Sequence, residues 1–150
     1  MASPIDQEVL DKYLTDAREN MALIESLTIQ LKQVHDRSAD IDNAIVNQIF
    51  RLLHSLKSQA GMLLLGNLEE IIHEFETLMQ QLRDKRMQFD AEITDLICVL
   101  VDFINPLIKH ISAHGNDDYE LETQSELKEN IRNTIQLKRI FIKRKHDPIV

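Results

Sequence analysis

The amino-acid sequence predicts an all-α protein, folded as an up-and-down antiparallel helical bundle of four core helices plus a fifth, C-terminal helix. Glycine and proline number only three each among 150 residues, which is too few for the tight turns that join strands in sandwiches and barrels. Hydrophobic residues make up 43% of the chain and charged residues 28%, an ordinary balance for one globular domain. Apolar residues recur at helical spacing along five segments, and the short connections between them favour antiparallel neighbours.

The first two helical segments have recognisable start and stop signals. In the first, Ser3 is a candidate N-cap and Pro4 takes the first helical position, and the segment ends at the break DRSAD. The second begins near Asp40 and is expected to end at Gly66 and Asn67, because both residue types tolerate the left-handed conformation that ends helices. The apolar stripes of these two segments are Leu10, Tyr13, Ala17, Met21, Ile24, Leu27, Leu31 and Val34, and then Ile45, Ile49, Leu52, Leu56, Ala60 and Leu63.

The remaining three segments follow the same spacing. The third ends around Asp84, and the fourth follows Asp90 and contains Pro106, which predicts a kink within one helix rather than a second domain. A loop at 115–120 precedes the fifth, weaker segment. The expected core positions are Leu68, Ile71, Ile72, Phe75, Met79 and Leu82 in the third, Ile93, Ile97, Leu100, Val101, Ile104 and Ile108 in the fourth, and Leu127, Ile131 and Ile135 in the fifth.

The charge is unevenly distributed along the chain. Its formal net value is −8, yet residues 138–150 carry five Lys or Arg side chains against one Asp. We therefore divide the chain into a domain at 1–137 and a basic C-terminal tail or linker at 138–150. The acidic body is a poor surface for nucleic acid, because phosphate contacts require clustered Lys and Arg. The basic tail offers a contact for nucleic acid or anionic lipid, but a solvated end or a linker is the simpler interpretation.

The sequence also predicts a cytoplasmic location. No apolar run approaches the roughly 18 residues of a membrane span, and the N-terminus lacks a signal-peptide pattern, so we expect no membrane partner. The single cysteine, Cys98, cannot form an internal disulfide, which fits a reducing compartment. It lies in the apolar run LICVLV, and we expect its side chain in the core.

Most enzyme and metal-site motifs are absent from the sequence. It contains no Gly-rich phosphate loop, no G-x-S-x-G elbow, no H-E-x-x-H and no paired C-x-x-C. His110 and His114 have the spacing of two ligands on one helix face, but no carboxylate or cysteine at matching spacing completes a metal site. We therefore expect neither a metal nor a cofactor.

His54 is the residue of the second segment that is best suited to take part in a chemical reaction. On a helical wheel it lies opposite the apolar stripe predicted for that segment, so its imidazole is expected to face solvent. Lys57 lies one turn further along, where its ammonium can neutralise a dianionic group attached to the imidazole. The alternative is an inert surface histidine.

The residues around His54 suggest a surface for a protein partner. Ser58 and Gly61 are small and leave room for a close approach, and Arg51 adds a second cation on the same side. Phe50 provides an apolar side chain where solubility alone would favour a polar one.

The third segment supplies a carboxylate at the same height as His54. Nearly equal numbers of residues separate His54 and Glu76 from Gly66, so antiparallel packing places the two side chains level. Glu76 can then accept a hydrogen bond from Nδ1–H, which leaves Nε2 as the exposed nucleophile. His73 lies further round the same side. The alternative is an ordinary polar contact between helices.

The segment at 49–61, IFRLLHSLKSQAG, resembles the active-site helix of histidine phosphotransfer (HPt) domains, whose signature is H-x-x-K-G followed by a small residue. It is most similar to the N-terminal phosphotransfer domain of CheA-type chemotaxis kinases, with F-R-x-x-H-S-x-K and a downstream H-x-x-E. The matching residues are Phe50, Arg51, His54, Ser55 and Lys57, followed by His73 and Glu76. The similarity covers roughly residues 6–137. Ser58 and Leu64 replace two glycines of that family, so we expect the second helix to continue to Gly66.

The resemblance implies a histidine phosphocarrier of two-component signal transduction. His54 would accept a phosphoryl group on Nε2 and pass it to the aspartate of a response-regulator receiver domain, with Lys57, His73 and Glu76 completing the site. Phe50, Arg51, Ser58 and Gly61 would form the docking surface. The phosphoryl donor would be a separate histidine kinase catalytic domain, because the chain has no nucleotide motif and no autonomous kinase activity is expected from it.

The sequence leaves two questions open. The chain is either a stand-alone phosphorelay protein or the phosphotransfer domain of a larger CheA-type kinase. A helical protein-binding adaptor without phosphoryl chemistry is the alternative function, and it requires His54 to be incidental.

Overall fold

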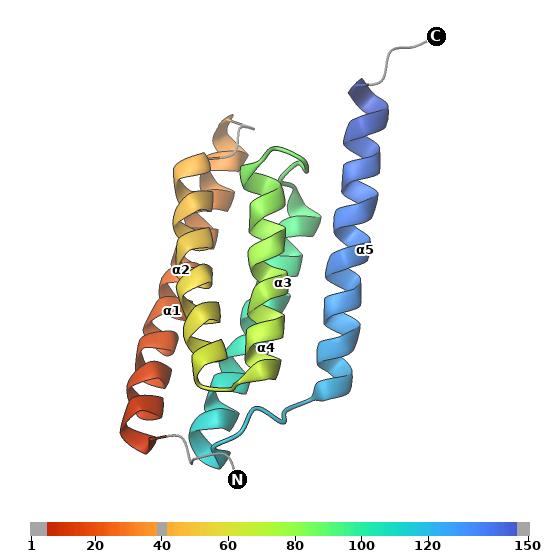
Figure 1. The fold of residues 1–150 in the computed structure, drawn as a ribbon. Helices are drawn as coiled ribbons and strands as arrows, with labels where there is room; N and C mark the ends of the chain where they lie inside the picture. Colours follow the sequence, from red (N-terminus) through yellow and green to blue (C-terminus); the bar gives the residue numbers. More distant parts are fainter. Residues whose placement is uncertain (1–5, 39–41, 147–150) are drawn as a thin grey trace.

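The computed structural model describes residues 6–38 and 42–146, and these form five helices without a strand. Figure 1 shows α1 to α4 as a bundle in which consecutive helices run in opposite directions, with α5 along its outside beside α3. The predicted architecture is therefore confirmed. The proposed cap at Ser3 and Pro4 lies outside the described residues, as does Asp40. The helices are α1 (Gln7–Ser38), α2 (Asn43–Met62), α3 (Gly66–Arg83), α4 (Ala91–His114) and α5 (Leu121–His146).

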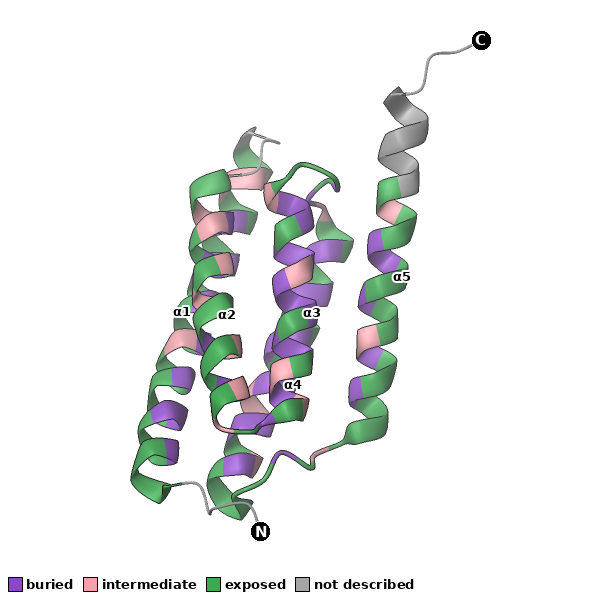
Figure 2. Ribbon diagram, viewed as in Figure 1, coloured by how far each residue is buried: buried purple, intermediate pink, exposed green. Residues whose placement is uncertain are grey.

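The core follows most of the predicted apolar stripes. Every stripe position in α3, α4 and α5 is buried, and so are those of α1 except the half-buried Val34. Figure 2 shows the buried positions on the sides of the helices that face one another. Among the described residues, no helix is long and apolar enough to cross a membrane.

The packing face of α2 differs from the predicted one. Val46 and Leu53 are fully buried, whereas Ile45 and Leu52 are only partly buried. In both pairs two apolar residues are adjacent in sequence, so helical periodicity alone does not decide which one faces the core. Contacts with α1 on one side and α3 on the other decide it, and they rotate the buried face of α2 toward Phe50.

The turn between α2 and α3 is tighter than predicted. α2 begins after Asp42, which accepts a hydrogen bond from the Ala44 amide at 3.0 Å, and it ends at Met62 rather than continuing to Gly66. Leu64 adopts the left-handed conformation with φ of 59°. The Leu65 amide then donates to the Ala60 carbonyl at 2.9 Å, and the Leu64 amide donates to the Gly61 carbonyl at 3.1 Å. These are the two hydrogen bonds of a Schellman motif, with leucine where glycine is usual.

We expect Leu64→Gly to raise the free energy of unfolding by about 1 kcal/mol, because a side chain in the left-handed region costs roughly that much. Leu64 is 73% exposed, so its removal loses little buried apolar surface. Urea denaturation of the two chains measures the difference, and Leu64→Ala, which keeps a Cβ, is the matched control. A Leu64→Gly midpoint at or below that of the unsubstituted chain would contradict this explanation.

A carboxylate from the loop at 115–120 fixes the start of α3. Leu65 is the N-cap residue of α3, and its side chain makes no hydrogen bond that caps the helix. Asp117 supplies it instead: its Oδ2 accepts from the amides of Asn67 at 2.7 Å and Leu68 at 3.1 Å. A carboxylate is favourable at the positive end of a helix dipole. The loop after α4 therefore caps the N-terminus of α3.

α4 begins after Asp90, as expected, and its structure corrects the placement of the cysteine. Asp90 accepts a hydrogen bond from the Ile93 amide at 3.0 Å, and the helix continues through Pro106 to its end before Gly115. Cys98 is exposed, so the expectation that it lies in the core is wrong. Its neighbour Ile97 occupies the core-facing side of the helix instead.

α5 continues without a break past the proposed boundary between 137 and 138. Lys138, the first residue of the predicted tail, binds Asp90 at 2.6 Å and Glu92 at 2.8 Å. Hydrogen bonds to these two carboxylates raise the pKa of Lys138. Burial raises the pKa of Asp90, but the hydrogen bonds from Lys138 and from the Ile93 amide outweigh burial and lower it overall. The division at 137 stays a prediction, although this part of α5 is held against α4.

Candidate functional site

His54 lies on α2 with its imidazole exposed and one edge facing α3. Its side chain is 59% exposed, and its Nδ1 atom lies 3.4 Å from Oε2 of Glu76, whose side chain is only 11% exposed. The predicted level arrangement of the two residues is therefore present. The 3.4 Å separation is longer than the roughly 2.7–3.2 Å of an ordinary N–H···O hydrogen bond. The two atoms are therefore in contact, at a distance just beyond that of an ordinary hydrogen bond.

The two oxygens of Glu76 have different surroundings. Oε1 accepts a hydrogen bond from Nζ of Lys57 at 2.9 Å. Oε2 is buried and has no hydrogen-bond partner within the described part of the chain. A buried acceptor without a partner is costly, so Oε2 favours an N–H at the position that His54 Nδ1 occupies. In a neutral imidazole only one nitrogen carries a proton, and a proton on Nδ1 leaves the lone pair on Nε2.

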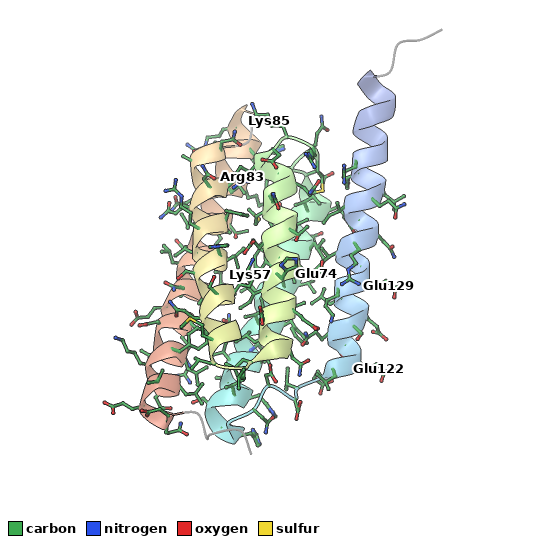
Figure 3. All side chains as sticks on the ribbon, viewed as in Figure 1. Lys57, Glu74, Arg83, Lys85, Glu122 and Glu129 are labelled. Carbon is green, nitrogen blue, oxygen red and sulfur yellow. The ribbon has the colours of Figure 1, made fainter. Side chains whose placement is uncertain are left out.

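Lys57 is placed differently from the sequence-based expectation. Its side chain is 19% exposed and lies between α2 and α3 (Figure 3). Its Nζ atom pairs with Oε1 of Glu76 at 2.9 Å. The ammonium was expected beside the imidazole, ready to neutralise a group on the ring. Lys57 instead neutralises Glu76, because the rotation of α2 turns Lys57 toward α3. Glu76 thus bridges a cation and the imidazole.

Phe50 is not an exposed apolar contact. It is half-buried against the core, and its ring stacks near the His54 imidazole, with 6.4 Å between centroids and 18° between planes. Arg83, at the end of α3, places its guanidinium carbon 4.3 Å from the centroid of the Phe50 ring. Sequence reasoning missed Arg83. The available signal was its spacing of two helical turns from Glu76 along the same edge of α3.

The three remaining residues of the predicted docking surface differ in their exposure. Arg51 and Ser58 are exposed, and the Ser58 hydroxyl donates to the His54 carbonyl at 3.0 Å. Gly61 is half-buried, and a Cβ there would lie 3.0 Å from Oε1 of Glu69 on α3. The expectation that Gly61 faces solvent and leaves room for a partner is wrong. Its missing side chain makes room for Glu69 instead.

His73 is exposed on α3 and lines a polar groove between α3 and α5. Two ion pairs cross this groove, Lys128 with Glu70 at 2.8 Å and Arg132 with Glu74 at 2.6 Å. Over residues 6–38 and 42–146, no hydrogen bond or ion pair joins the His73 ring to His54, Lys57 or Glu76. The structure therefore brings three of the four predicted site residues together and leaves His73 apart.

The histidine pair on α4 is engaged within the protein. The rings of His110 and His114 stack with 4.3 Å between centroids, and His110 Nε2 contacts the Asn116 side-chain oxygen at 3.2 Å. In the described part of the chain, no group of three or more His, Cys, Asp or Glu residues is placed to hold a metal ion.

Comparison with known proteins agrees with this fold. The family model described as Hpt domain matches residues 8–114. The chain therefore belongs to the Hpt domain family, which confirms the resemblance to HPt domains.

The similar proteins point to one branch of that family. The chain is 26% identical over 111 residues to the sensor histidine kinase CheAY of Helicobacter pylori, a match that covers 74% of this chain. It is 33% identical over 88 residues to the chemotaxis protein CheA of Cereibacter sphaeroides, covering 58% of this chain. The matches cover only 13% of each of these two relatives.

Two solved structures have the same fold. One is the phosphorylated P1 domain of CheA3 in complex with CheY6 from R. sphaeroides, with a TM-score of 0.75 and 22% identity over 87% of this chain and 98% of that chain. The other is the histidine phosphotransfer domain of CheA in solution, with a TM-score of 0.73 and 22% identity over 85% of this chain and 92% of that chain.

Proposed function

We propose that this chain is a histidine phosphocarrier of two-component signalling, which accepts a phosphoryl group on Nε2 of His54 and passes it to an aspartate of a receiver domain. One observation supports this function best. The imidazole is more than half exposed, while its Nδ1 edge faces the buried, otherwise unpartnered oxygen of Glu76. That arrangement leaves the Nε2 lone pair for a donor in solution.

The proposed phosphoryl transfer takes place in two steps, and in each step one bond to phosphorus forms as another breaks. The Nε2 lone pair attacks the γ-phosphorus of ATP held by a kinase catalytic domain, so that an N–P bond forms, the P–O bond to ADP breaks, and ADP leaves. The ring gains positive charge while Nδ1 keeps its proton, and the carboxylate of Glu76 stabilises that charge. In the second step a receiver aspartate oxygen attacks the phosphorus, the N–P bond breaks, and the neutral imidazole returns.

The partners follow from the relatives. The P1 domain solved with CheY6 supports a receiver domain as the phosphoryl acceptor. The CheA relatives support a histidine kinase catalytic domain as the donor, and such a partner is expected in the cytoplasm. This chain spans only 13% of those relatives, and the proposal concerns the phosphocarrier step alone.

Phosphoryl incorporation tests this function directly. The purified chain is incubated with a CheA-type catalytic core and labelled ATP, and then with a receiver domain. We expect an acid-labile, alkali-stable label on the chain that moves to the receiver. A chain that binds the receiver but never takes up label would instead be a helical adaptor.

We expect the receiver to dock on α1 and α2 around Arg51 and Ser58, with a buried interface below about 1,200 Å² because the encounter must be transient. Ser58→Arg should reduce the rate of transfer to the receiver at least about tenfold, since the new side chain stands on an exposed position one turn from His54. A time course of transfer, with samples quenched at each time point, measures the rate. The matched control is Asn133→Arg, on an exposed position of α5. An unchanged rate in Ser58→Arg would place the docking surface elsewhere.

A further inference from the structure

We infer that Phe50 and Arg83 form a positioning pair that fixes the plane of the His54 imidazole. This inference rests on the proposed function, because it concerns how the same imidazole is oriented for phosphoryl transfer. It assigns Phe50 to the orientation of the nucleophile instead of the docking surface, and it adds Arg83, a residue outside the H-x-x-K and H-x-x-E motifs.

The first contact is the stack between Phe50 and His54. Their centroids are 6.4 Å apart and their planes differ by 18°, within the range of about 4.5–7 Å found for interacting aromatic pairs. Phe50 precedes His54 by one helical turn, so both side chains lie on the same face of α2. The phenyl ring is half-buried against the core and therefore offers the exposed imidazole a fixed neighbour.

The second contact holds the phenyl ring from the opposite helix. The guanidinium carbon of Arg83 lies 4.3 Å from the Phe50 centroid, a cation–π distance. Arg83 is itself fixed by Asp84, whose Oδ1 accepts a hydrogen bond from its Nε at 3.3 Å. A continuous set of contacts thus connects the end of α3 to the His54 ring on α2.

The two partners of His54 restrain different motions. Glu76 contacts Nδ1 at the edge of the ring, which orients the nitrogens but permits the ring to tilt. The Phe50 ring lies nearly parallel to the imidazole, with 6.4 Å between centroids, and restricts that tilt. The χ2 torsion of histidine is broad and roughly two-fold, so an exposed imidazole with one edge contact samples many orientations of Nε2. Fixing that orientation before the donor arrives removes part of the entropic barrier to transfer.

A small-molecule donor separates positioning from docking. Phosphoramidate phosphorylates an accessible imidazole without a protein partner, so its rate reports the ring alone. We expect Phe50→Leu to slow labelling of His54 by phosphoramidate about three- to tenfold, and Arg83→Gln about two- to fivefold. Phe50→Tyr keeps the ring and should restore the rate. Arg86→Gln removes the same charge from an exposed position three residues away and should have no effect.

A spectroscopic measurement adds a readout that a purely structural defect does not produce. The ¹⁵N shifts of the His54 ring report which nitrogen carries the proton, and we expect the Nδ1–H form in the unsubstituted chain and a mixture of forms in Phe50→Leu. Melting curves show whether each variant folds. If Phe50→Leu proves unfolded, the inference is tested by the labelling rates of Arg83→Gln, which should be slowed, and Phe50→Tyr, which should not.

The possible results distinguish this inference from the proposed function. If the unsubstituted chain is not labelled on His54 at all, the proposed function fails. If it is labelled and the folded Phe50→Leu and Arg83→Gln chains react at the same rate, the positioning pair is wrong. Slowing that occurs with the receiver but not with phosphoramidate would return Phe50 to the docking surface and also contradict the inference.

Discussion

We expect His54→Gln to abolish phosphoryl incorporation from both a kinase catalytic core and a phosphorylated receiver. The glutamine amide has no nucleophilic lone pair on nitrogen, and no other described histidine has a buried carboxylate against Nδ1 within ion-pair distance. The substitution should change the free energy of unfolding by less than about 0.5 kcal/mol, because the His54 side chain is 59% exposed. Labelled ATP and a parallel melting curve measure both effects.

Two results would overturn this expectation. Label that persists in His54→Gln would assign the phosphoryl group to another residue. His73→Gln is the matched control, because His73 is exposed on the adjacent helix and lacks contact with Glu76. If His73→Gln also lost all label, the site would depend on an arrangement of residues that differs from this structure.

The second large effect is expected at Glu76. Its carboxylate faces Nδ1 and stabilises the positive charge that develops on the ring as Nε2 attacks phosphorus. Glu76→Gln should slow labelling of His54 about 10- to 100-fold without preventing it. Positioned proton-handling groups typically contribute about 10²–10⁴-fold, and the effect should lie at or below the lower limit because the imidazole is solvent-exposed. Initial rates of labelling at saturating donor measure the effect.

Glu74→Gln is the control for this substitution. Glu74 lies on the same helix and its side chain is 10% exposed, but it pairs with Arg132 on α5 rather than with His54. Its replacement should leave the rate unchanged. Equal slowing in Glu74→Gln and Glu76→Gln would show that any lost charge on α3 has the same effect, and the specific role of Glu76 would be wrong.

The structure also changes the expected stability of a Glu76 variant. From sequence the residue was expected to make a half-exposed contact worth under about 1 kcal/mol. Its side chain is instead 11% exposed and pairs with the partly buried ammonium of Lys57. Glu76→Ala leaves that ammonium without its partner and should cost about 1–3 kcal/mol, so the glutamine variant is the better test of rate.

The features that sequence predicted correctly depend on periodicity and on simple counting. The stripes of α1, α3 and α4 recur at regular helical spacing, and almost all of their positions are buried. The proximity of His54 and Glu76 followed from two antiparallel arms of nearly equal length. The start of the fourth helix after Asp90 followed from the apolar spacing that begins at Ile93.

The features that sequence missed depend on packing between helices. In α2, adjacent apolar residues left the buried face undetermined, and the error placed Phe50, Lys57 and Gly61 too far toward solvent. Arg83 and Asp117 act across helices, through a ring on α2 and the amides at the start of α3. The spacing of Arg83 from Glu76 indicated only a shared edge of α3, because the contacts with other helices are created when the bundle forms.

The central claim is that Nε2 of His54 carries the phosphoryl group while Nδ1 keeps its proton toward Glu76. The most direct measurement is an NMR experiment at alkaline pH on the phosphorylated chain with ¹⁵N-labelled histidine, which detects coupling between phosphorus and the bonded ring nitrogen. We predict coupling to a single nitrogen, Nε2 of His54, with a proton on Nδ1. Coupling to Nδ1, or to a nitrogen of any other histidine, would contradict the claim.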